Sequence, residues 1–307
     1  MKGSILDGKK VSQEILDGLQ KEVIDCQARG LRKPGLAAVL VGMNPASQIY
    51  VSSKVKTCAK LDYYSEKIEL KEDTSQDELL ALVKSLNAKE EIDGILVQLP
   101  LPKHIDESLI LDAISPSKDV DGFHPENMGR LLIDKPFLVP CTPLGIIELL
   151  KKYNVELRGR RAVVVGRSHI VGKPMSIMLL KEHATVTICH SRTRDLEKVT
   201  SEADILIAAM GKKAFLGFDH IREGAVVVDV GINRVTDEEE VKILYPDDEE
   251  RLKQVREKGS TLVGDVLPPA MWEKASLYTP VPGGVGPLTI AGLMMNTFKA
   301  YREHVGA

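Results

Sequence analysis

Tyr50 and Lys54 are a pair of residues whose types and spacing could carry out acid–base chemistry. They lie four residues apart in a stretch with helical character, so their side chains share one helix face. A tyrosine hydroxyl beside a lysine ammonium can pass protons to and from a bound substrate. An exposed helix can carry the same two residues by chance, and the pair alone does not separate these interpretations.

Three further segments offer groups that a flat polar ligand could contact. Gln98 ends an apolar strand, where doubly wound folds bind ligands, and its amide can hydrogen-bond a neutral lysine or a substrate amide. Asp121 lies in a tight turn, and its two oxygens could accept from the N–C(–NH₂)–N edge of a 2-aminopyrimidinone, although an Asx-turn explains the same residue. Residues 282–286 contain two consecutive glycines between prolines, which predicts a wall with few side chains.

The run from Val163 to Pro174 reads as a strand, a glycine turn and the start of a helix. Backbone N–H groups at such a helix start favour an anion, usually a dinucleotide pyrophosphate. A Walker A loop is excluded, because Pro174 stands where that motif needs a magnesium-binding serine or threonine. A tight turn without a ligand has the same pattern.

The segment after the next strand indicates which dinucleotide binds. NAD-binding folds place an aspartate or glutamate there for the ribose hydroxyl, but this chain has Ser191, Arg192, Thr193 and Arg194. Guanidinium groups suit a 2′-phosphate, which they hold with charge-assisted hydrogen bonds. The segment therefore favours an NADP-binding site; the alternative interpretation is a pair of surface arginines that bind no ligand.

The elements that position these residues alternate between helix and strand, which predicts the α/β fold class. We expect helices at 10–29, 46–61, 75–88, 142–153 (with Thr142 as N-cap) and 287–304, and strands at 36–41, 65–70, 94–99, 161–165, 185–189, 205–209 and 225–230. The last four strands are short and apolar and predict a parallel sheet covered on both faces. Residues 1–140 with 287–307 are predicted to form an N-terminal α/β catalytic domain, and residues 141–286 a C-terminal Rossmann-like doubly wound parallel-sheet domain. The charged segment 235–260 is predicted to be a solvated excursion.

Composition excludes several classes of protein. With 307 residues, 43% of them hydrophobic and 28% charged, the chain has the size and composition of a two-domain globular protein. A net charge of −3 and 4% aromatic residues argue against a nucleic-acid partner, and no run approaches the roughly 20 apolar residues that span a membrane. The N-terminal residues lack a targeting pattern and the four cysteines are widely spaced, so we expect a cytoplasmic protein with reduced thiols. The histidines lack metal-ligand spacing, so no metal site is predicted.

Taken together, the motifs resemble the bifunctional methylenetetrahydrofolate dehydrogenase/methenyltetrahydrofolate cyclohydrolase (FolD) family. They occur in the family's order across nearly the whole chain, which makes the resemblance specific. The matching runs are YVSSK at 50–54, DGILVQLPLP at 93–102, KDVDGFHP at 118–125, PCTPLG at 140–145, GRSHIVGKP at 166–174, VVVDVGINR at 226–234, LVGDV at 262–266 and TPVPGGVGPLT at 279–289.

The resemblance implies an enzyme of one-carbon metabolism, serving purine biosynthesis, with its active site in the cleft between the two domains and usually a homodimer. It implies that 5,10-methylenetetrahydrofolate is oxidised with NADP⁺ and that the methenyl product is hydrolysed to 10-formyltetrahydrofolate. Lys54 would be the main catalytic residue, with Tyr50 shaping the folate site, Gln98 supporting Lys54 and Asp121 anchoring the pterin edge.

The resemblance also implies two sets of binding residues. The substrate would contact Tyr50, Val51, Ser52, Ser53, Lys54, Val97, Gln98, Leu99, Asp121, Pro282, Gly283, Gly284, Val285 and Gly286. The cofactor would contact Gly166, Arg167, Ser168, Ser191 and Ile232, to which the charge argument adds Arg192.

Some alternatives stay open at this point. The segment 235–260 is longer and more acidic than expected for compact bacterial members of the family. A dehydrogenase without cyclohydrolase activity, and a catalytically silent NADP-binding module, are the competing functions. A short-chain dehydrogenase is disfavoured, because there the Tyr-x-x-x-Lys motif follows the glycine turn, whereas here it precedes it.

Overall fold

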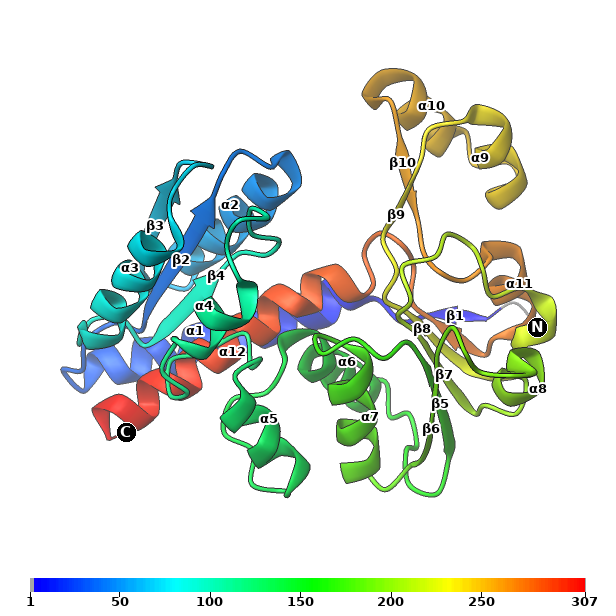
Figure 1. Cartoon of the computed structure of the whole chain (residues 1–307). Helices are drawn as coiled ribbons and strands as arrows, with labels where there is room; N and C mark the ends of the chain where they lie inside the picture. Colours follow the sequence, from blue (N-terminus) through cyan, green and yellow to red (C-terminus); the bar gives the residue numbers. More distant parts are fainter. Residues whose placement is uncertain (1–2, 307) are drawn as a thin grey trace. The chain divides into compact units, whose positions relative to one another are not determined.

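The chain folds into two compact units, each built from two stretches of sequence (Figure 1). The structure is a computed structural model that describes residues 3–306, apart from the side chain of Ala46. One unit, here called the three-stranded unit, contains Ser12–Cys141 and the residues from Thr289 onward. The other, the six-stranded unit, contains the residues up to Val11 and Thr142–Leu288.

The three-stranded unit is a parallel sheet in the order β3-β2-β4 with helices around it. Its strands are β2 (Gly35–Val41), β3 (Tyr64–Leu70) and β4 (Gly94–Val97). Its helices are α2 (Pro45–Lys60), α3 (Gln76–Ala88), α4 (Glu107–Asp112) and α5 (Pro125–Leu132), with most of α1 (Gly8–Ala28) and α12 (Val285–Val305). The helices and strands predicted for this part of the chain are confirmed, with ends that differ by one or two residues.

The central strand β2 explains why both faces of this sheet are covered. All its residues are buried, and they alternate between two hydrophobic clusters. Leu36, Ala38 and Leu40 pack in one cluster with residues of α1 and α12, whereas Ala37, Val39 and Val41 pack in the other with residues of α3. Successive side chains of a strand point to opposite faces, so an apolar strand without alternation needs cover on both.

The six-stranded unit is a parallel sheet in the order β1-β11-β8-β7-β5-β6. Its strands are β1 (Ser4–Ile5), β5 (Arg161–Val165), β6 (Thr185–Cys189), β7 (Ile205–Ala208), β8 (Val226–Asp229) and β11 (Leu277–Tyr278). Its helices are α6 (Cys141–Lys152), α7 (Gly172–Lys181), α8 (Leu196–Thr200) and α11 (Pro268–Lys274), with a 3₁₀ turn at Phe218–His220. The predicted doubly wound fold is confirmed: the chain runs from β5 to β6 on one side, then crosses to β7 on the other.

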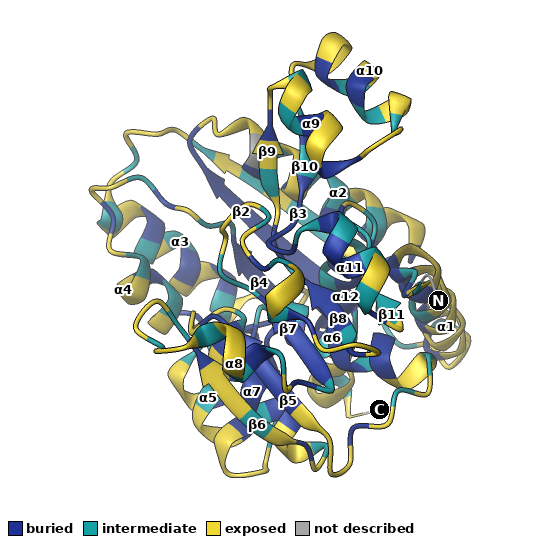
Figure 2. Cartoon of the chain, turned by 90° about the vertical axis from the view of Figure 1, so that its right-hand side faces the viewer, coloured by how far each residue is buried: buried dark blue, intermediate teal, exposed yellow. Residues whose placement is uncertain are grey.

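Three local predictions differ from the structure. Strand β6 is mostly exposed and not covered on both faces, because it lies at the edge of the sheet (Figure 2). Helix α6 begins at Cys141, so Thr142 is its second residue and not its cap; Pro143 is tolerated there because the first four N–H groups of a helix have no intrahelical partner. Residues 4–5 pair with β11 in the six-stranded sheet, whereas the sequence placed them in the other domain.

Most residues of the segment 235–260 are exposed, as predicted for a solvated excursion, but the segment is folded. Strand β9 (Asn233–Val235) pairs antiparallel with β10 (Thr261–Val263), and helices α9 (Glu238–Leu244) and α10 (Glu249–Lys258) lie between them. We call residues 233–263 the hairpin insert. Its apolar residues recur among the charges and form a small core of their own: Val235, Val241, Leu244, Tyr245, Leu252, Val255 and Val263 (Figure 2).

In the described part of the chain, residues 3–306, no helix has the length and apolar character needed to cross a membrane.

Candidate active site and cofactor site

Lys54 and Gln98 meet in the three-stranded unit. Lys54 lies on α2 with 8% of its surface exposed, and its Nζ donates to Gln98 Oε1 at 3.0 Å. Gln98 follows β4, and its own Nε2 donates to the carbonyl of Leu99 at 2.8 Å, which turns the amide oxygen toward the lysine. The structure therefore brings together the lysine and the glutamine that the sequence pairs.

Asp121 lies in the electrostatic field of Lys54. Burial raises the pKa of this carboxyl, the charge of Lys54 opposes that shift and the neighbouring Asp119 adds to it, so that the resulting pKa is about 6. The hydrogen bonds of the turn go to Asp119, which accepts from the N–H groups of Phe123 and His124. Because Asp119 makes the turn, the Asx-turn interpretation does not explain Asp121.

The remaining folate candidates of this unit differ in what a ligand could reach. Tyr50 lies on the same helix as Lys54 and is 44% exposed. Ser52 and Ser53 are partly exposed, as is Leu99. Val51 and Val97 are buried in the hydrophobic core, so only their backbone atoms remain for a ligand.

Residues 282–286 belong to the six-stranded unit: 282–284 lie in the turn between β11 and α12, and 285–286 are the first residues of α12. Pro282 and Gly286 are exposed. Gly283 has a φ of 102°, and its carbonyl accepts from the N–H of Lys9 at 3.1 Å. Because these residues and Lys54 belong to different units, their sharing of one site in a cleft stays a prediction.

The glycine turn after β5 forms a backbone cradle. Gly166 has a φ of 139°, and a Cβ there would lie 2.1 Å from the carbonyl oxygen of Ala209. A Cβ on Gly172 would lie 2.2 Å from the carbonyl oxygen of Gly166. Ser168 Oγ accepts from the N–H groups of Val171 and Gly172, which closes the turn at the start of α7. Only glycines permit this close approach.

A pocket of about 420 Å³ lies over this turn, at the carboxyl ends of β5, β6 and β7. Its lining includes the predicted cofactor residues Gly166, Arg167, Ser168 and Ser191, and it adds Val165, His190, Thr193, Leu196, Ala209, Met210, Lys212 and Phe215. Arg192 is the exposed neighbour of Ser191, and Ile232 is an exposed residue after β8. Lys212 was missed by the sequence analysis, although its position just after an apolar strand was the available signal.

Asp265 organises the loop that carries Lys212. Its carboxylate is fully buried and accepts from three consecutive backbone N–H groups, those of Met210, Gly211 and Lys212, at 2.7–2.9 Å. It also accepts from Asn233 Nδ2 at 3.0 Å. Asp265 belongs to the LVGDV motif at 262–266, whose residues alone do not predict this role.

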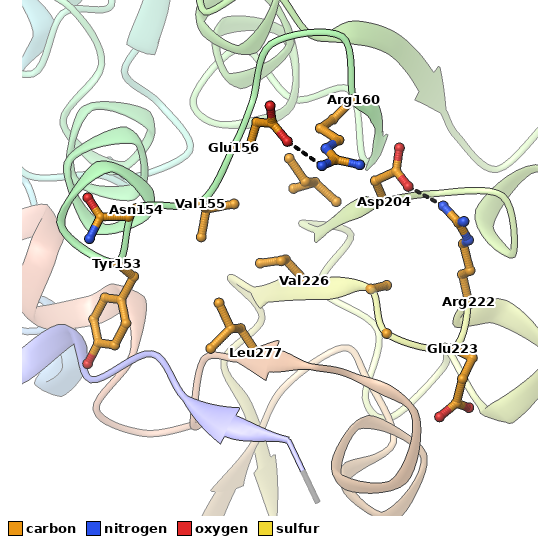
Figure 3. Close-up of a pocket in the computed structure, with 13 residues that line it drawn as sticks. Tyr153, Asn154, Val155, Glu156, Arg160, Asp204, Arg222, Glu223, Val226 and Leu277 are labelled. Carbon is orange, nitrogen blue, oxygen red and sulfur yellow. Dashed lines mark hydrogen bonds and ion pairs between the residues drawn. The ribbon is translucent and has the colours of Figure 1, made fainter. Parts of the chain in front are cut away.

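A second pocket of about 360 Å³ lies at the other ends of the strands of the same sheet, the amino ends of β5, β7 and β8 (Figure 3). Its floor is apolar, with Val226 and Leu277, and two ion pairs, Glu156 with Arg160 and Asp204 with Arg222, line it. Ligands of doubly wound folds bind at the carboxyl ends of the strands, so we place the cofactor in the pocket over the glycine turn and not in this one.

Comparison with known proteins identifies the family. A family model described as the tetrahydrofolate dehydrogenase/cyclohydrolase NAD(P)-binding domain matches residues 140–305, and the model of the catalytic domain of the same family matches residues 6–121. The chain belongs to the tetrahydrofolate dehydrogenase/cyclohydrolase family. It is 54% identical to a bifunctional FolD protein of Solibacter usitatus over 98% of each chain.

Two solved structures of family members have the same fold. The bifunctional FolD enzyme of Campylobacter jejuni is 45% identical, with a TM-score of 0.88 over 98% of this chain and 99% of that one. The FolD enzyme of Trypanosoma brucei, in complex with NADP cofactor and inhibitor, is 36% identical, with a TM-score of 0.90 over the full length of both. The family, the two-domain α/β fold, the dual dehydrogenase and cyclohydrolase activity and NADP as cofactor, all predicted from the sequence, are confirmed.

Proposed function

We propose that Lys54 is the catalytic residue of the cyclohydrolase step and that Gln98 and Asp121 act with it on the folate. The observation that carries the proposal is the hydrogen bond from the buried Lys54 Nζ to Gln98 Oε1, within the electrostatic reach of Asp121. A buried amine with one oriented acceptor is suited to hold and pass a proton at a fixed point.

The hydrolysis needs such a group. Water that attacks the methenyl carbon must lose a proton, and a folate ring nitrogen must gain one as the ring opens. Lys54 Nζ is the group to hold that proton, Gln98 keeps the amine in place, and Tyr50 shapes the site beside them. Asp121 offers two acceptor oxygens to the N–C(–NH₂)–N edge of the pterin.

The dehydrogenase step needs orientation more than proton transfer, because the folate nitrogens already push electrons toward the departing hydride. NADP⁺, when bound, accepts that hydride. Gly166, Arg167 and Ser168 would hold its pyrophosphate in the glycine turn, where there is no room for a Cβ on the glycines. Ser191 and Arg192 would bind its 2′-phosphate. Ile232 would also contact the cofactor, and residues 282–286 would line the folate site.

Lys54→Ala tests the proposal, with Lys56→Ala as its matched control on an exposed position of the same helix. We expect Lys54→Ala to lower the rate of methenyltetrahydrofolate hydrolysis at least about a hundredfold, the usual contribution of a general acid–base residue, while NADP⁺ binding is unchanged. Lys56→Ala should behave as wild type. Unchanged hydrolysis in Lys54→Ala would refute the assignment.

We also propose that the enzyme acts in the cytoplasm, as the sequence predicts, and that it is a homodimer, which rests on the family resemblance. Sedimentation equilibrium gives the oligomeric state directly, and a mass of 33.7 kDa in solution, that of one chain, would contradict the dimer.

A further inference from the structure

Arg251 on α10 is one of the residues through which the hairpin insert contacts the rest of its unit, together with Glu240, which pairs with Lys213, and Tyr245, whose ring lies against Trp272. Its Nη1 donates to the carbonyl of Leu262 at 2.6 Å, and its Nη2 donates to the carbonyl of Val281 at 2.7 Å. Its Nε donates to Asp248 Oδ2 at 3.1 Å. The guanidinium lies 3.6 Å from the centre of the Tyr245 ring, and the side chain is only 16% exposed.

These contacts use the particular shape of arginine. A planar guanidinium offers donors in fixed directions and can also stack on an aromatic face. Asp248 and Tyr245 belong to the hairpin insert, so the insert provides both the carboxylate and the aromatic ring that orient the guanidinium of Arg251. The remaining Nη2 donor then points out of the insert, to a carbonyl 30 residues further along the chain.

The carbonyl that receives this bond belongs to the turn predicted to contact folate. We call residues 279–284 the folate loop. Its first residue is fixed from the sheet, because Thr279 Oγ1 accepts from the N–H of Asp229 at 2.8 Å. Its far end is fixed by the N–H of Lys9, which donates to the carbonyl of Gly283 at 3.1 Å. Arg251 holds the middle, at Val281, next to the exposed Pro282.

Besides Arg251, the middle of the loop is held by the N–H of Gly284, which donates to the carbonyl of Pro280 at 2.8 Å, and by the buried Val281 side chain. Gly283 and Gly284 have no side chains, and glycine loses more conformational freedom on folding than any other residue. A donor at Val281 therefore restrains the segment at the point where the predicted substrate contacts begin.

We infer that Arg251 is a positioning residue for folate: the hairpin insert carries a guanidinium that holds the folate loop in its binding conformation. The inference rests on the proposed function, in which residues 282–286 line the folate site. It gives the acidic insert a role in substrate affinity, although the inferred contact with folate is made by the loop and not by the insert.

The test compares Arg251→Ala with Arg256→Ala, which removes an exposed arginine of the same helix that pairs with Glu238. We expect Arg251→Ala to raise the KM for methenyltetrahydrofolate about tenfold, with kcat within about twofold of wild type, because one charge-assisted hydrogen bond orders the loop before binding. The Kd for NADP⁺ should stay unchanged, and Arg256→Ala should match wild type in every measurement.

Arg251→Lys keeps the inference testable where the alanine variant does not fold. A lysine keeps the charge but cannot bridge two carbonyls and stack on Tyr245 at once, so we expect an increase in KM of severalfold with an unchanged melting temperature. A folate KM within twofold of wild type in a folded variant would overturn the inference. A parallel loss of NADP⁺ affinity would also overturn it, because it would show a general loss of structure.

Gly283→Ala separates failure of the inference from failure of the proposed function. A Cβ at this position would lie 3.2 Å from Lys9 Cε, in a backbone conformation with a φ of 102°, so the substitution strains the loop directly. If Gly283→Ala raises the folate KM and the Arg251 variants do not, only the inference is wrong. If none of these variants changes the folate KM, the loop does not line the folate site and both proposals fall.

Discussion

Replacing Asp121 with asparagine should make the three-stranded unit more stable while weakening folate binding. Burial raises the pKa of this carboxyl from 3.8 to about 6, which means that the fold disfavours its ionised form. The difference between these pKa values corresponds to about 3 kcal/mol of unfolding free energy. Asparagine has nearly the same shape but no charge to desolvate.

The sign of the pH dependence follows from proton counting. Between pH 3.8 and about 6 the folded protein binds more protons at Asp121 than the unfolded chain does, so the wild type loses stability as the pH rises through this range. Asp121→Asn has no such loss. Its advantage in unfolding free energy should therefore be about 3 kcal/mol at pH 8 and about half of that at pH 5.

Urea denaturation followed by far-UV circular dichroism at pH 5 and pH 8 measures this difference. Trp272, the single tryptophan, lies in the six-stranded unit, so its fluorescence follows that unit separately. Asp112→Asn, which changes an exposed carboxylate of the same unit as Asp121, is the control and should leave the midpoint unchanged. A variant less stable than wild type at pH 8, or a gain equal at both pH values, would refute the reasoning.

The activity of the same variant tests the role of the carboxylate. In the proposed folate site an ionised Asp121 accepts two hydrogen bonds from the pterin edge, whereas an asparagine amide would direct N–H groups at one of those donors. We expect Asp121→Asn to raise the folate KM roughly tenfold to a hundredfold at pH 7.5. In the wild type the KM should rise as the pH falls below about 6, where the carboxyl becomes protonated, and in Asp121→Asn it should not.

Two predictions concern the cofactor side. Arg192→Ala should raise the KM for NADP⁺ about tenfold to a hundredfold and leave that for NAD⁺ unchanged, since in the proposed site the guanidinium contacts only the 2′-phosphate. Arg160→Ala, in the pocket at the amino ends of the strands, is the control, and an equal change for both cofactors would contradict the prediction. Asp265→Asn should lower the unfolding free energy of the six-stranded unit by about 2–4 kcal/mol and weaken NADP⁺ binding, because an amide cannot accept all four hydrogen bonds that the carboxylate accepts. An Asp265→Asn variant with the unfolding free energy and NADP⁺ affinity of the wild type would contradict the proposal that Asp265 organises this loop.

Much of the local structure could be predicted from the sequence because its causes are local. Strands β5 and β6 run over the predicted residues, since short runs rich in the β-branched residues valine, threonine and isoleucine favour a strand over a helix. The glycine turn was recognisable because only glycine accepts the φ and the close approach at Gly166. Helical spacing placed Tyr50 and Lys54 on one face, whereas the pairing of Lys54 with Gln98 was implied by the family resemblance.

The hairpin insert shows where such reasoning failed. Its many charges predicted a solvated segment, but the apolar residues between them fold into a core that closes only when β9 pairs with β10. That pairing joins Val235 to Thr261, and composition within a window cannot detect it.

By itself, the sequence determined the positions of strands β2–β8 and of the helices α1, α2, α3, α6 and α12, the residues with reactive chemistry and the family. The tertiary structure alone decided which carboxyl carries a raised pKa, which strand lies at the edge, and that Arg251 reaches Val281. Burial, strand order and long-range hydrogen bonds depend on groups that are distant along the chain, whereas helical periodicity and turn chemistry depend on neighbours.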